Sequence, residues 1–266
     1  MVDQDFADQH AARIDAIASN FFEQLTQVMD AVRVRVTSRL LQELAIEGGW
    51  VQSNMQNSAV IRSMDTMFSE ELGSSNYHAV VAAFVSTLSL QIDEFSSAYA
   101  MAQEKYPRLR GLFTLTESDA GVLADQAGAA LLALETKSLE ATSALRTLSS
   151  KSLGGILVSD LIEVVSGIIR KVAEVEQMGI DQLTTFFRLV GNLVYSNIEK
   201  LGLVIFYKLF GIRDSRNRSF CAALLDANKL YTRAEIDLMD NGQIPGVFDN
   251  VGGYGCRHWF TLWDIR

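Results

Sequence analysis

Apolar residues in the first fifth of the chain follow a helical pattern. Between Ile14 and Leu44 they recur at steps of three and four, as one face of an α-helix requires, until Gly48-Gly49 ends the pattern. The repeating positions are Ile14, Ile17, Phe21, Leu25, Val28, Val32, Val36, Leu40 and Leu44. The pattern predicts one long amphipathic helix over residues 4–46. Most steps are of four residues, which favours straight or slightly right-handed packing over the left-handed seam of a heptad coiled coil.

Further apolar patterns continue to residue 210. They predict helices over residues 50–72, 76–105, 116–149, 155–177 and 181–210. Tyr106-Pro107 ends the 76–105 helix, because a residue before proline is disfavoured in the helical conformation. Thr116 and Asp119 form a capping box that begins the next helix, and Gly179 separates the last two. We therefore expect a mainly α fold in which residues 1–210 form an elongated bundle of long antiparallel helices.

The composition changes near Gly211. Residues 211–266 contain both cysteines, two of the three tryptophans and a glycine-rich run from Gly252 to Gly255. They also carry seven basic and seven acidic residues, so the net charge of -9 lies entirely in residues 1–210. This change predicts a second domain over 211–266, which we expect to be a compact, irregular α+β unit that contains the cysteines.

Composition and charge exclude several classes of protein. Two cysteines are too few for a disulfide-dense secreted scaffold. The net charge of -9 disfavours strong binding to nucleic acid. Three aspartates in the first ten residues disagree with a secretory signal peptide. The segment most similar to a membrane span, 153–169, is interrupted by Asp160 and Glu163, so we expect a buried helix there.

Cys221, Cys256 and His258 are the main candidates for site chemistry. Thiolates and imidazoles are ligands that zinc selects, and Cys256 and His258 are separated by a single residue. A fourth ligand would have to be Asp214, Asp226 or water. Alternatively, the two cysteines lie next to each other as buried thiols, or they form a disulfide worth about 3 to 4 kcal/mol in loop entropy. The residues alone leave disulfide, free thiols and zinc open.

The remaining patterns indicate protein contacts and no catalytic residues. The chain has no Gly-x-Ser-x-Gly elbow, phosphate loop or His-Glu-x-x-His helix. An aspartate interleaves the basic run 213–218, which favours salt bridges or a protein interface over nucleic-acid binding. Two tryptophans near the end of the sequence are candidates to anchor a partner. The interface candidates are Arg213, Asp214, Arg216, Arg218, Trp259 and Trp263.

The order and spacing of residues in 214–258 resemble a known motif. The matching positions are Asp214, Arg216, Arg218, Phe220-Cys221, Tyr231-Thr232, Glu235-Ile236, Asn241-Gly242-Gln243, Gly252-Gly253-Tyr254 and Cys256-Arg257-His258. Together they resemble the C-terminal motif of tailed-bacteriophage minor head proteins, the group that includes the Mu F-like head morphogenesis proteins. The resemblance covers about 50 residues. Relatives often place a histidine shortly after the first cysteine, whereas Ala222 follows Cys221 here, which weakens the case for a four-ligand zinc site.

The resemblance implies a structural minor protein of a tailed-phage virion. Such a protein acts in head assembly or at the portal and neck, through contacts with portal, neck or major capsid protein and with copies of itself. We expect it in the virion, and in the host cytoplasm during assembly, with neither cofactor nor enzymatic activity. One alternative is an internal protein ejected with the genome, whose apolar helix over 156–175 would contact the host envelope. Another is a zinc-dependent enzyme built on Cys221, Cys256 and His258.

Overall fold

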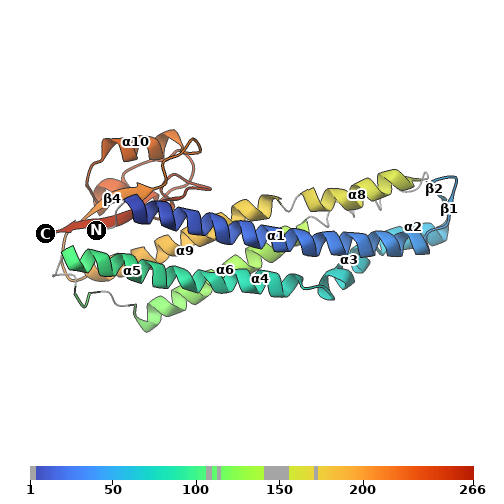
Figure 1. Cartoon of the computed structure of the whole chain (residues 1–266), viewed down its shortest axis with the longest axis horizontal. Helices are drawn as coiled ribbons and strands as arrows, with labels where there is room; N and C mark the ends of the chain where they lie inside the picture. Colours follow the sequence, from blue (N-terminus) through green and yellow to red (C-terminus); the bar gives the residue numbers. More distant parts are fainter. Residues whose placement is uncertain (1–3, 106–109, 113–114, 141–155, 171–172) are drawn as a thin grey trace. The chain divides into compact units, whose positions relative to one another are not determined.

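The computed structural model describes residues 4–105, 110–112, 115–140, 156–170 and 173–266 (Figure 1). The chain is mainly helical with a small sheet near its C-terminus, which confirms the predicted fold class. It forms two compact units. The first comprises Met1–Ala18, Val85–Ala130 and Gln177–Arg266, and the second comprises Ser19–Phe84 and Leu131–Glu176. The first unit thus combines the C-terminal sheet with parts of several helices. This division differs from the domain boundary predicted at residue 211.

The long N-terminal helix is α1, Gln4–Glu43, and its prediction is confirmed. In the second unit the buried positions of α1 keep the helical spacing seen in the sequence: Phe21, Leu25, Met29, Val32, Val36 and Leu40. Phe21 stacks on Phe84 with ring centroids 4.3 Å apart. Arg35 and Arg39, on the more exposed side of α1, pair with Glu71 and Glu70. The helix is therefore held by an apolar face and by ion pairs at its edge.

Residues 50–72 of the second unit do not form the single helix predicted. The short strand β1 (Ile46–Glu47) pairs with β2 (Trp50–Val51), and β2 pairs in turn with β3 (Ile156–Leu157). The helices α2 (Met55–Arg62) and α3 (Met64–Gly73) follow. Asn57 of α2 is buried and holds the turn that carries β1 and β2. Its side chain accepts a hydrogen bond from the Ala45 amide and donates to the carbonyls of Ala45 and Gln52. The unit also contains most of α4 (Tyr77–Ser86) and α8 (Val158–Arg170).

The predicted 76–105 segment is helical throughout, from α4 through the short helix η1 (Thr87–Ser89) to α5 (Leu90–Lys105). Helix α6 (Glu117–Glu140) follows. Its predicted capping box is confirmed: the Thr116 amide donates to Asp119 Oδ2 at 2.7 Å, and the Asp119 amide donates to Thr116 Oγ1 at 3.2 Å. The predicted helix end near Ser149 and the start at Gly154-Gly155 lie outside the described residues.

Among the described residues, one helical stretch, Tyr77–Ala100, has the length and composition of a membrane span. Val80, Val81 and Phe84 within it are buried in the core. In the predicted apolar helix, α8, Leu161 and Val165 are buried as well. Packing inside the protein therefore accounts for these five residues, and 39% of the most apolar 18-residue window of Tyr77–Ala100 is buried.

Helix α9 (Ala173–Glu199) and strand β4 (Ile205–Gly211) replace the helix predicted over 181–210. The expected break at Gly179 is wrong, because this glycine is buried inside α9. The helix ends at Glu199, and Gly202 takes the left-handed φ of 80° that favours glycine after a helix end. The aromatic and β-branched run that follows, Ile205–Phe210, is typical of a strand.

The C-terminal sheet has the strand order β5-β4-β6 and is antiparallel. Its outer strands are β5 (Tyr231–Thr232) and β6 (His258–Ile265). Helix α10 (Ser219–Ala227) lies between β4 and β5 in sequence, and the helices α11 (Arg233–Asp237) and α12 (Val247–Asn250) lie between β5 and β6. We call residues 205–266 the cap.

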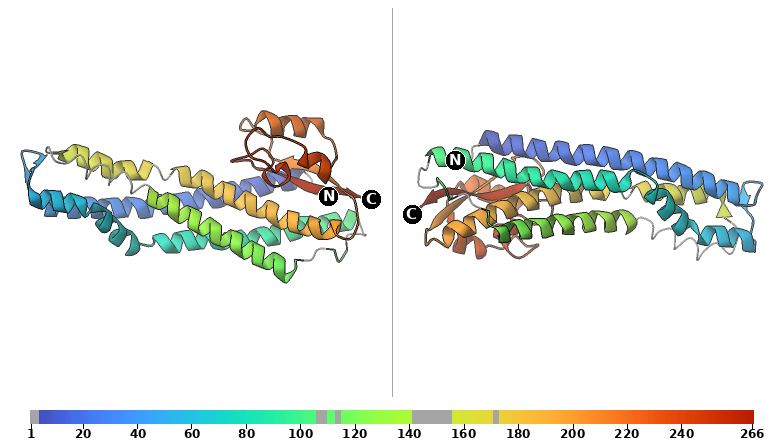
Figure 2. Two further views of the ribbon diagram at one scale, coloured as in Figure 1. Left: turned by 180° about the vertical axis from the view of Figure 1, so that it is seen from behind. Right: turned by 90° about the horizontal axis from the view of Figure 1, so that it is seen from below.

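An aromatic cluster joins the cap to helices of the first unit. Phe187 of α9 lies at its centre, with ring centroids 4.0 Å from His10, 5.7 Å from Phe95 and 5.2 Å from Trp259. These rings come from α1, α9, α5 and β6, which meet in the first unit (Figure 2). The cap is therefore not a separate domain on a linker, since its sheet shares a core with three helices.

Candidate functional site

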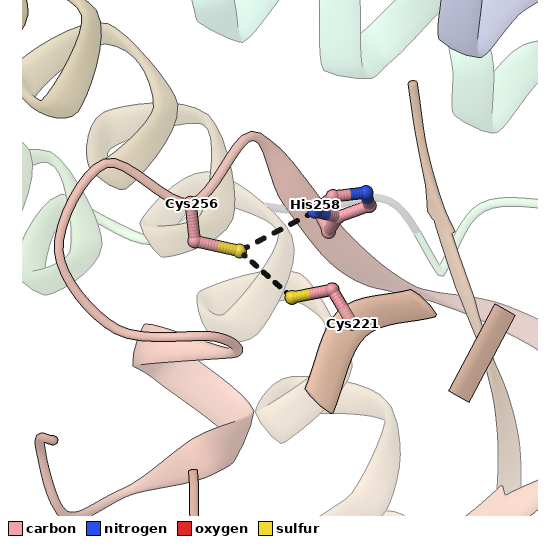
Figure 3. A group of neighbouring side chains, drawn as sticks. All are labelled: Cys221, Cys256 and His258. Atoms are coloured by element: carbon pink, nitrogen blue, oxygen red, sulfur yellow. Dashed lines mark hydrogen bonds between the residues drawn. The ribbon is translucent and has the colours of Figure 1, made fainter. Parts of the chain in front are cut away.

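Cys221, Cys256 and His258 come together at one end of the C-terminal sheet (Figure 3). Cys221 lies in the first turn of α10, Cys256 in the loop before β6, and His258 at the first position of β6. The two sulfurs are 3.6 Å apart, and Cys256 Sγ is 3.5 Å from His258 Nδ1. All three side chains are buried. We call these three residues the thiol–imidazole cluster.

The adjacency of the two cysteines agrees with the expectation from sequence. A separation of 3.6 Å is well above the roughly 2.05 Å of a disulfide bond, and both residues are free thiols in this structure. Two sulfurs and an imidazole nitrogen within 4.8 Å of one another are a ligand set that suits zinc. The geometry brings these residues together through three different segments of the cap, so it depends on the complete fold of residues 205–266.

The sheet register fixes the orientation of His258. Its partner in β4 is Gly211, and the ring reaches past that glycine to the Ile212 carbonyl, 2.9 Å from Nε2. Because a carbonyl can only accept a hydrogen bond, His258 Nε2 is the donor to Ile212. Nδ1 is the ring nitrogen that faces Cys256 Sγ.

Buried Arg188 of α9 holds the loop that carries the cluster. Its Nε donates to the His258 carbonyl at 2.9 Å, Nη1 donates to the Asp249 carbonyl at 3.2 Å, and Nη2 donates to the Cys256 carbonyl. Burial lowers the pKa of Arg188, and the nearby Cys256 thiol opposes this shift. The guanidinium thus fixes the backbone on both sides of residue 257 and places a positive charge beside the sulfurs.

The two thiols have pKa values that shift in opposite directions. The pKa of Cys256 is lowered because the Cys221 thiol donates a hydrogen bond to it; burial opposes this shift, while His258 and Arg188 reinforce it. The pKa of Cys221 is raised by the same hydrogen bond and by burial. The two shifts belong to the pair, because the hydrogen bond between the sulfurs is the largest cause of both.

Two glycines make room for the cluster. A Cβ atom on Gly252 would lie less than 3.0 Å from Cys221 Sγ and 3.2 Å from Cys256 Sγ, and the Gly252 amide donates to Cys256 Sγ at 3.3 Å. A Cβ atom on Gly211 would lie 2.8 Å from His258 Cγ. Any side chain at these two positions would therefore displace the cluster.

Several residues of the resembled motif stabilise the loops of the cap. Arg218 donates to Gln243 Oε1 at 2.6 Å and to the Gly252 carbonyl. Asn241 donates to the Val251 carbonyl at 2.8 Å. Thr232 and Glu235 form a capping box at the start of α11. The contacts of Arg218 and Asn241 connect segments that are up to 34 residues apart in sequence, so these motif residues form a bonded network across the loops.

The predicted interface residues differ in their environment. Arg213 pairs with Asp226 at 2.8 Å, and Asp214 accepts from Arg257 at 2.6 Å and from Arg216 at 3.2 Å. These bonds fit the expected internal salt bridges. The side chain of Arg216 remains 62% exposed.

The two tryptophans also differ. Trp259 is buried against Phe187 and His10, so it is a core residue and is not available to anchor a partner. Trp263 is half-buried and stacks on Phe210, with Lys208 Nζ 4.0 Å from its ring centroid. The expectation for Trp259 is therefore corrected, because it faces the shared core of the first unit.

Two buried polar groups of the first unit, Arg188 and Glu94, were not predicted from the sequence. Arg188 interrupts the apolar run Phe186–Val190, and a charge within such a run is a signal of a buried polar network. Buried Glu94 of α5 binds His10 Nδ1 and receives a 2.8 Å hydrogen bond from Arg13. The partners of Glu94 are 81 and 84 residues away, so no local pattern indicates them.

Comparison of the chain with models of protein families, with curated proteins and with solved structures found no match.

Proposed function

We propose that this chain is a structural minor protein of a tailed-phage virion, acting in head assembly or at the portal and neck through protein contacts. The observation that carries the proposal is the bonded network of the resembled motif. Arg218, Gln243 and Gly252 connect the loops, and Cys221 and Cys256 meet beneath them. A motif whose residues hold one another in place defines a rigid small surface, which is what a recurring assembly contact requires.

The surface of the cap supports an interaction role. Leu238 and Tyr254 are 88% and 70% exposed, although both are large and apolar enough to be favoured in a core. Tyr254 borders a hollow of about 370 Å³ that is also lined by Arg216, Arg218 and Arg257. Tyrosine and arginine are enriched among the residues that dominate protein interfaces. We assign the partner contact to this hollow, which we call the arginine hollow.

The partner in this proposal is the portal, a neck protein or the major capsid protein, and the chain is present in several copies. It carries out no catalytic turnover and acts inside the virion after assembly in the host cytoplasm. The net charge of -9 is consistent with contacts to protein rather than to packaged DNA.

A phage that encodes this chain provides the test. We expect Tyr254→Ala to reduce the amount of the chain in purified particles by about 30-fold, because truncating a central interface tyrosine costs about 2 kcal/mol. The matched control is Leu201→Ala, which removes an exposed apolar side chain (62% exposed) that is not among the residues lining the arginine hollow. The control should incorporate normally.

Two results would count against the proposal at different levels. Normal incorporation of Tyr254→Ala would refute the arginine hollow as the contact site. The virion role itself would be refuted by two findings together. The wild-type chain would be absent from particles, and complete deletion of the gene would leave the yield and infectivity of particles normal.

A further inference from the structure

We propose that the thiol–imidazole cluster binds one zinc ion through Cys221 Sγ, Cys256 Sγ and His258 Nδ1, with a water molecule as the fourth ligand. The site lies within the first unit and stands on its own geometry. It does not depend on the proposed virion role, because a metal-stabilised cap could serve any interaction.

The spacing of the ligand atoms matches a tetrahedral zinc site. With Zn–S near 2.3 Å and Zn–N near 2.0 Å, tetrahedral geometry places two sulfurs about 3.8 Å apart and sulfur about 3.5 Å from nitrogen. The observed separations are 3.6 Å between the sulfurs and 3.5 Å between Cys256 Sγ and Nδ1. The third pair, Cys221 Sγ and Nδ1, lies within 4.8 Å, so a small rotation of the Cys221 side chain completes the triangle.

The groups around the ligands already have the arrangement that a metal site needs. A histidine that binds zinc normally donates its other ring N–H to a carbonyl or carboxylate, and His258 Nε2 is 2.9 Å from the Ile212 carbonyl. The Gly252 amide donates to Cys256 Sγ, as backbone amides do to metal-bound thiolates. Arg188 fixes the carbonyls of Cys256 and His258, so two of the three ligands are held in place by their own backbone.

A small cavity beside the cluster provides the fourth position. It has a volume of about 20 Å³, enough for one water, and its lining includes Asn217, Cys221, Cys256 and His258. Asn217 Oδ1 is buried and finds no hydrogen-bond partner within the described part of the chain. A buried acceptor without a donor is destabilising. A water bound to the metal would donate to this oxygen and complete its hydrogen bonding.

The ligand types select zinc over the hard cations. Calcium and magnesium prefer oxygen ligands, whereas two thiolates and an imidazole suit zinc. Binding of the metal displaces the thiol protons to solvent, and two thiolates then balance the charge of the divalent ion. The loaded site is neutral and tolerates the neighbouring guanidinium of Arg188.

The test uses the full chain, purified with a reductant, loaded with zinc sulfate and passed through gel filtration. We expect elemental analysis to find one zinc per chain. Cys221→Ser, Cys256→Ser and His258→Ala should each reduce the retained zinc at least about 10-fold, since even losing a group that orients a ligand costs 10- to 100-fold in affinity. His78→Ala is the matched control, because His78 is exposed on α4 and outside the cluster, and it should retain one zinc.

A second measurement avoids dependence on variants that fail to fold. Wild-type chain loaded with cobalt(II) should show sulfur-to-metal charge-transfer absorption and the intense visible bands of tetrahedral cobalt, and zinc should abolish both. Zinc should also protect both cysteines from alkylation until a chelator is added.

Three outcomes would overturn the zinc site. The first is that the folded, reduced wild-type chain retains no zinc. The second is that cobalt binds without thiolate charge-transfer absorption. The third is a mass lower by two hydrogens, which would show that the two cysteines form a disulfide in the purified protein. None of these outcomes bears on incorporation into particles, so failure of the zinc site is distinguishable from failure of the virion role.

Discussion

Replacing Arg188 with methionine tests whether the cap depends on this buried guanidinium. Methionine retains most of the length of the side chain and its apolar contacts but cannot donate a hydrogen bond. The change leaves the carbonyls of Asp249, Cys256 and His258 without the donors that Arg188 provides. The loop before β6 then loses its connection to α9.

The magnitude follows from these three bonds. Each buried carbonyl left without a partner costs about 1 to 3 kcal/mol, and relief from burying a charge offsets part of the sum. We expect Arg188→Met to lower the free energy of unfolding of the first unit by about 3 kcal/mol. Arg188→Lys should lie between the wild type and Arg188→Met, because a single ammonium cannot reach three carbonyls in a fork.

Equilibrium unfolding in urea, followed by tryptophan fluorescence, provides the measurement, because Trp259 and Trp263 both lie in β6. Arg216→Met is the matched control. It removes an exposed guanidinium whose surface ion pairs are worth about 0 to 1 kcal/mol. If Arg188→Met unfolds within about 0.5 kcal/mol of the wild type, the guanidinium does not hold the cap.

Three further predictions concern single positions in the first unit. Gly252→Ala should destabilise the first unit by about 1 to 3 kcal/mol in the same urea assay, because the added Cβ would overlap Cys221 Sγ. The control is Gly128→Ala in α6, where a Cβ would meet no atom within 4 Å, and this change should stabilise by about 0.5 to 1 kcal/mol. Equal effects of the two substitutions would refute the packing argument. Hydrogen bonds from Thr116 lower the pKa of Asp119, so its contribution is present above pH 4 and is lost as the pH falls through the folded-state pKa. Asp119→Asn should therefore cost about 1 kcal/mol at neutral pH and less as the pH is lowered through the folded-state pKa, whereas a cost that does not change with pH would contradict the ionised cap. Gly202→Ala should raise the unfolding rate and cost about 1 kcal/mol because φ is 80° there; an unchanged stability would show that the turn relaxes.

The helices were predictable where one apolar face repeats and local residues end it. Helix α1 is an example, since seven of the nine positions that the spacing identifies are buried; at the other two, Ile17 and Val28 are half-buried and the next residues, Ala18 and Met29, are buried instead. The Thr116 and Asp119 capping box is another, because both partners lie within one turn of the helix. Such features depend on neighbours in sequence, which a sequence displays directly.

Features that depend on distant partners were not predictable in the same way. Strand β4 was expected to extend a helix because both of its faces are largely apolar, and its main partner β6 begins 47 residues after β4 ends. The sulfurs were expected to meet, but the sequence could not show that Gly252 makes room for them or that Arg188 holds their loop. These relations arise only once α9, α10 and β6 are packed together.

The most direct measurement of the central claim is quantitative mass spectrometry of purified particles of a phage that encodes this chain. The account predicts peptides of the chain at a fixed ratio to the portal protein, corresponding to several copies in each particle. The same ratio should be found in every preparation and should survive washing at high salt, because the contact is a packed protein surface. Infectious particles that contain none of this chain would contradict the account.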